Sequence, residues 1–88
     1  MLQRLTILEQ CELHRSGTVL VKLALLVVDG SKVISQDWHR AAIPQEVDPQ
    51  LQMAAVNAHL EHMGAPQLSQ SEVDFIAECH AFLGKPRL

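Results

Sequence analysis

The first half of the chain shows the hydrophobic pattern of β-strands. Residues 4–13 alternate partly between apolar and polar side chains, which predicts a strand with one buried face. The segment from Val19 to Val28 is apolar at almost every position, so we expect a central strand that is covered on both faces. A third strand is expected over residues 33–42.

Two short glycine-containing segments predict tight turns between these strands. Arg15-Ser16-Gly17 suits a three-residue hairpin loop, and Gly30-Ser31 suits a two-residue one. The strands should therefore form an antiparallel meander. Only Glu9 is out of phase, because it would lie opposite Leu23 on the buried face. The expected cross-strand pairs are Leu13 with Val19, Cys11 with Val21, Ile7 with Leu25, Leu5 with Val27, Ile34 with Val27, and Trp38 with Leu23.

Apolar residues take helical spacing after the third strand. Asp48 can cap a helix whose first residue is Pro49, and this helix is expected over residues 49–63. The capping box Ser69-Gln70-Ser71-Glu72 predicts a second helix over residues 70–83. The residues expected to face the sheet are Leu51, Val56, Leu60 and Met63 in the first helix and Val73, Ile76, His80 and Leu83 in the second.

These elements predict an α+β fold of β-β-β-α-α order, a three-stranded meander followed by a helical hairpin, in one domain of residues 1–88. Two helices can cover only one face of the sheet. The other face of the central strand would present Leu20, Ala24, Leu26 and Val28, and we expect a partner to bind there.

A dense group of specific side chains occurs in the third strand. The only tryptophan, Trp38, lies on the predicted core face, which favours a role as a core anchor. Asp37 and His39 would then lie on the opposite face near Lys22. We interpret this polar fringe as part of the partner-binding surface.

Composition excludes several classes of partner. The net charge is −3 and the seven Lys and Arg residues are scattered, so we expect no nucleic-acid binding. The longest apolar run is about half the length of a membrane helix, and the N-terminus lacks the pattern of a secretion signal. We expect neither membrane association nor a small-molecule substrate, and we expect the chain to remain in a cytoplasm.

Few residues suggest chemistry. His59 and His62 are spaced to share a metal ion on one side of a helix, which leaves a metal-binding protein as a minor alternative. Cys11 and Cys79 lie in different predicted elements and are expected to be reduced, buried thiols. No catalytic residue and no cofactor site is predicted, and the chain is not expected to be an enzyme.

The segment from Trp38 to Pro44, Asp48, and the segment from Gln50 to Gly64 resemble small proteins encoded in the tail-gene region of tailed bacteriophages and prophages. The likeness extends from about the central strand through the first helix, a little more than half of the chain. It implies a non-enzymatic virion or tail-assembly role, with self-association and other virion proteins as partners, after synthesis in the bacterial host cytoplasm. The alternative is a small phage-encoded inhibitor that binds one host protein.

Overall fold

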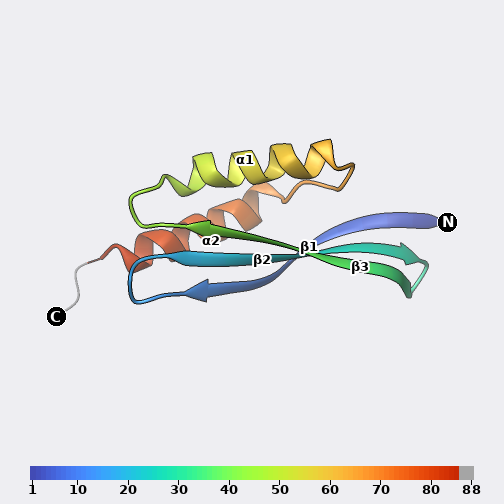
Figure 1. Cartoon of the computed structure of the whole chain (residues 1–88), viewed down its shortest axis with the longest axis horizontal. Coiled ribbons are helices and arrows are strands. Elements are labelled where there is room, and N and C mark those ends of the chain that lie inside the picture. Colours follow the sequence, from blue (N-terminus) through green and yellow to red (C-terminus); the bar gives the residue numbers. More distant parts are fainter. Residues whose placement is uncertain (86–88) are drawn as a thin grey trace.

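The computed structural model describes residues 1–85 and contains three antiparallel strands followed by two helices (Figure 1). This order confirms the predicted α+β fold. The elements are β1 (Leu2–Leu13), β2 (Val19–Asp29), β3 (Lys32–Ile43), α1 (Pro49–His62) and α2 (Gln70–Leu83). Among residues 1–85, no helix has the length and apolar content needed to cross a membrane.

The sheet is a meander with β2 in the centre. Gly17 and Gly30 have positive φ values of 99° and 61° in the two turns, a backbone conformation that glycine adopts without steric cost. Both helices lie on one face of the sheet, near the end that holds the β1–β2 turn (Figure 1). The β2–β3 turn and the N-terminus extend beyond the helices at the other end, which gives the molecule an elongated shape of 52 × 21 × 18 Å.

The core lies between the helices and one face of β2. Every second residue of β2 near the helices is buried, so the strand contributes one face to this core. Each large apolar side chain that leaves water here stabilises the fold by about 1.5–3 kcal/mol. The buried core residues are Val19, Val21 and Leu23 of β2, Ile43 of β3, Met53, Val56 and Leu60 of α1, Leu68, and Val73 and Ile76 of α2.

The predicted helix starts are confirmed. An oxygen of Asp48 accepts a hydrogen bond from the backbone amide of Gln50 at 2.9 Å. Ser69 and Glu72 form both hydrogen bonds of the capping box. Two predicted core residues of this helix are wrong. Leu51 is 71% exposed, and Met53 occupies the buried position in the first turns of α1. Met63 is 43% exposed at the end of the helix.

The link from β3 to α1 is held against α2 by polar contacts. The side-chain nitrogen Nε2 of Gln45 donates hydrogen bonds to the backbone carbonyl oxygens of Gly17 and His80, at 3.0 and 3.1 Å. Nε2 of His80, a buried ring, lies 2.9 Å from the carbonyl oxygen of Pro44. These contacts satisfy the buried polar groups where the hairpin turn, the link and α2 meet.

A β-bulge in β1 changes the predicted pairing with β2. Glu9 is left out of the ladder, and Leu8 takes the position opposite Leu23 and packs against the core. The bulge thereby keeps a carboxylate off the buried face. The pairs of Leu13 with Val19 and Cys11 with Val21 are confirmed, whereas Ile7 lies opposite Ala24 instead of Leu25, and Leu5 opposite Leu26 instead of Val27.

A second bulge in β3 reverses the faces predicted for Trp38 and its neighbours. Ile34 is left out of the ladder, so Trp38 lies opposite Ala24 instead of Leu23. The prediction of Trp38 as a core anchor is wrong, because its side chain lies on the face away from the helices and is 41% exposed. His39 takes the position opposite Leu23 on the helix-covered face.

Leucines at two positions of α1 provide a matched test of this core. Leu60→Ala should lower the free energy of unfolding by about 2–5 kcal/mol, because Leu60 is fully buried and its removal leaves a cavity. Leu51→Ala, on the exposed side of the same helix, should change it by less than about 0.5 kcal/mol. Urea unfolding followed by circular dichroism measures both, and equal losses would contradict the assigned packing.

Candidate protein-binding surface

The face of the sheet opposite the helices has no covering element among residues 1–85. We call it the open face. Because residues paired across neighbouring strands point to the same side, it consists of rows of three residues, one from each strand. The rows are Gln3, Val28 and Val33; Leu5, Leu26 and Gln36; Ile7, Ala24 and Trp38; Gln10, Lys22 and Arg40; and Glu12, Leu20 and Ala42.

One half of the open face, toward the β2–β3 turn, is mainly apolar. Ile7 and Trp38 are 40% and 41% exposed and lie on either side of Ala24, which is only 1% exposed. The two large side chains therefore supply the accessible surface of this row, and Ala24 lies beneath it. Val28 is likewise buried, whereas Val33 beside it is exposed.

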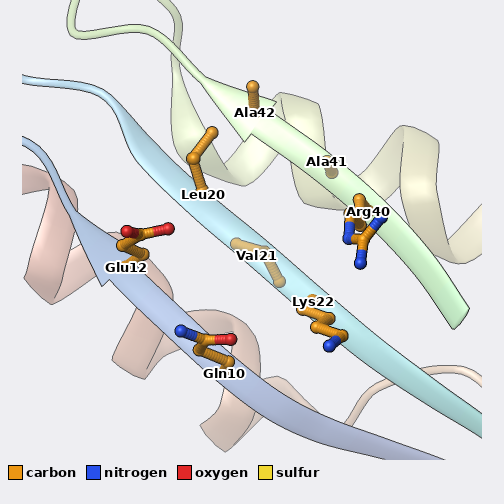
Figure 2. Close-up of a pocket in the computed structure, with 8 residues that line it drawn as sticks. All are labelled: Gln10, Glu12, Leu20, Val21, Lys22, Arg40, Ala41 and Ala42. Carbon is orange, nitrogen blue, oxygen red and sulfur yellow. The ribbon is translucent and has the colours of Figure 1, made fainter.

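The other half of the open face carries charge around a pocket of about 440 Å³ (Figure 2). Glu12 and Gln10 project from β1 on one side, and Lys22 and Arg40 project from β2 and β3, with the helices behind the sheet. Nζ of Lys22 lies 4.2 Å from the centre of the Trp38 ring, a cation–π contact that draws this side chain toward β3.

The two other charged residues at the pocket, Glu12 and Arg40, have few oppositely charged partners within residues 1–85. Oε2 of Glu12 lies 3.6 Å from Nε2 of His14, and both side chains are about half exposed. The side chain of Arg40 makes no salt bridge or hydrogen bond within residues 1–85. An exposed carboxylate and an exposed guanidinium therefore flank the pocket and are available to a partner.

The structure divides the predicted partner-binding residues between the two faces. Leu20 and Leu26 lie on the open face and are partly exposed, and Ala24 and Val28 lie there but are buried. Asp37 and His39 lie on the helix-covered side, so their prediction as part of the same surface is wrong. The bulge at Ile34 is the cause, because a shift of one residue exchanges the faces of a strand. Ile7, Trp38 and Arg40, which the sequence did not indicate as contact residues, take their place.

The imidazole of His59 packs against His39 rather than sharing a site with His62. The ring centres of His39 and His59 are 5.2 Å apart, with 32° between the ring planes, so this pair joins β3 to α1. Within residues 1–85, no three His, Cys, Asp or Glu side chains converge on a point where they could hold a metal ion.

The two cysteines lie in contact, although their elements are far apart in the sequence. The Cys11 thiol of β1 lies beside the Cys79 thiol of α2, and both side chains are partly buried against the core. Burial raises the pKa of the Cys11 thiol to about 11, and the neighbouring Cys79 thiol adds to this increase. Cys11 is therefore a weak nucleophile at neutral pH, because the thiolate is the reactive form.

Alkylation of Cys11 should follow this raised pKa. Because few Cys11 thiols are ionised near pH 8, iodoacetamide should modify Cys11 much more slowly in the folded protein than in urea, and the folded rate should rise steeply up to about pH 11. Peptide mass spectrometry after timed quenching measures the rate. A rate for folded Cys11 that levels off near pH 9, the ordinary thiol value, would contradict the assignment.

Comparisons with known proteins do not add to this geometry. Family models, curated proteins and solved structures were compared with the chain, and none of them matches it. The function is therefore inferred from the open face and from the residues that form it.

Proposed function

We propose that this protein is a non-enzymatic structural or assembly protein that acts through protein–protein contacts of its open face, including contacts with further copies of itself. The observation that supports this proposal is the position of Ile7 and Trp38. Each residue is about two fifths exposed, on a face that neither α1 nor α2 covers. The proposal assigns no catalytic residue, cofactor, nucleic acid or small-molecule substrate to the chain.

The residue types and the edges of the sheet favour association through this face. Burial of apolar side chains is the main favourable term in protein association, and tryptophan and arginine are the residues that most often dominate binding energy. Trp38 and Arg40 lie in neighbouring rows of the open face. β1 and β3 are also both edge strands, so their outer backbone groups are open to a further strand.

The resemblance of the central segment to tail-region proteins of phages and prophages suggests where the proposed assembly takes place. On this proposal the chain is synthesised in a bacterial cytoplasm and is incorporated into a tail or virion, where several copies contact one another and other virion proteins. Repeated contacts between copies are what a particle requires from such a subunit, because symmetric assemblies reuse one surface many times.

Sedimentation velocity across the micromolar concentration range tests self-association. The sedimentation coefficient should rise with concentration, and the fluorescence of Trp38, the only tryptophan, should shift to shorter wavelength as its ring leaves water. A chain that remains monomeric with unchanged emission at every concentration would refute self-association.

A pair of matched variants locates the contact. Trp38→Ser should weaken self-association by roughly thirtyfold or more, the loss typical of a residue that dominates an interface. Leu51→Ser is the control, because Leu51 is equally apolar and more exposed but lies on α1, away from the open face. Equal weakening by both variants would show that association does not use the open face.

A further inference from the structure

We propose that the second copy packs face to face on the open face about a two-fold axis that runs along β2, which pairs Glu12 of each copy with Arg40 of the other. This inference rests on the proposed function, since it specifies how copies associate. In such a dimer β1 of one copy lies over β3 of the second, and the helices lie on the outside of a four-layer arrangement.

The rows of the open face determine which residues meet. An axis along β2 brings each row against the same row of the second copy, with the β1 member opposite the β3 member. Ile7 then lies opposite Trp38 of the second copy, and this apolar contact occurs twice by symmetry. Gln10 lies opposite Arg40 of the second copy.

The charges of the open face favour this axis over the alternative. Among the paired residues that make up the rows, the one carboxylate is Glu12 on β1, and Arg40 lies one row away on β3. An axis along β2 brings β1 against β3, so these opposite charges come together twice. A two-fold axis across the strands brings β1 against β1 and β3 against β3, and Glu12 then never meets Arg40. Charge complementarity of this kind suppresses incorrect orientations.

The positions of Lys22 and the pocket also suit this arrangement. Lys22 lies on the central strand, where two copies would place like charges on either side of the axis. Its ammonium group is drawn over Trp38, toward β3 and away from the axis, which separates the two cations. The pocket between Glu12 and Arg40 leaves room for the long Arg40 side chain of the second copy to approach Glu12 (Figure 2).

The size of the open face indicates how strong the contact is. Three strands of about 12 residues extend over roughly 40 Å by 14 Å, or about 550 Å² per copy and about 1,100 Å² for two. Specific interfaces bury about 1,200–2,000 Å², and weak or transient ones fall below that range. We therefore expect a dimer that dissociates on dilution.

The experiment uses Glu12→Arg and Arg40→Glu, first separately and then mixed. Each variant alone brings like charges together at both symmetric contacts, so its self-association should weaken by about tenfold or more. In an equimolar mixture, a dimer with one copy of each variant has opposite charges at both contacts. Association in the mixture should therefore return to within about threefold of the wild-type value. Sedimentation velocity measures all four samples.

General charge attraction does not explain such a recovery. The wild-type net charge is −3; replacing Glu by Arg adds two positive charges and gives −1, and replacing Arg by Glu gives −5. Both variants are negative, so they repel each other at long range. The matched control pair is Glu46→Arg with Arg15→Glu, two exposed residues outside the sheet that carry the same charge changes. These variants should associate like the wild type, alone and mixed.

The outcomes separate this inference from the proposed function. If the wild type self-associates but the mixture does not recover, the axis along β2 is wrong while association through the open face stands. If the wild type does not self-associate at any concentration, both fail. Circular dichroism and thermal unfolding of each variant show whether it is folded. A folded single variant that associates as strongly as the wild type overturns the pairing of Glu12 with Arg40.

Discussion

The structure depends on the packing of one face of β2 against two helices. Val19, Val21 and Leu23 are almost completely buried there, and they form the base of the single core. Residues 1–85 contain only two helices with which to cover the sheet, so the fold can bury one face and must leave the other to solvent or to a partner. The apolar character of β2 on both faces is therefore the feature on which the proposed association depends.

The order and limits of the elements could be predicted because their signals are local. Asp48 with Pro49 and the capping box at Ser69 each define a helix start through residues within one turn. Gly30 with Ser31 likewise defines the β2–β3 turn, since Asp29 and Lys32 pair across it. Such features need no knowledge of the rest of the chain.

The strand register could not be predicted, because it depends on contacts between distant segments. Counting from a turn fixes the pairing only if no residue is skipped, and both Glu9 and Ile34 are skipped. For β1 the signal was present in the sequence, since an unbulged strand placed the Glu9 carboxylate opposite Leu23. For β3 there was no such signal, and the predicted site therefore contained Asp37 and His39 and lacked Trp38. The four residues predicted from β2 alone lie on the open face, as expected. They are Leu20, Ala24, Leu26 and Val28.

The end of the sheet that extends beyond the helices has a consequence for local stability. The strands near Gly30 extend beyond the helices (Figure 1) and are held mainly by ladder hydrogen bonds and by side chains that remain partly in water, whereas Val21 and Leu23 are buried between the sheet and the helices. Amide protons near Gly30 should thus exchange with solvent through local opening, and those at Val21 and Leu23 only through opening of the whole domain. A copy packed on the open face would remove this difference, because it would cover the extended end and join it to the cooperative unit of the core.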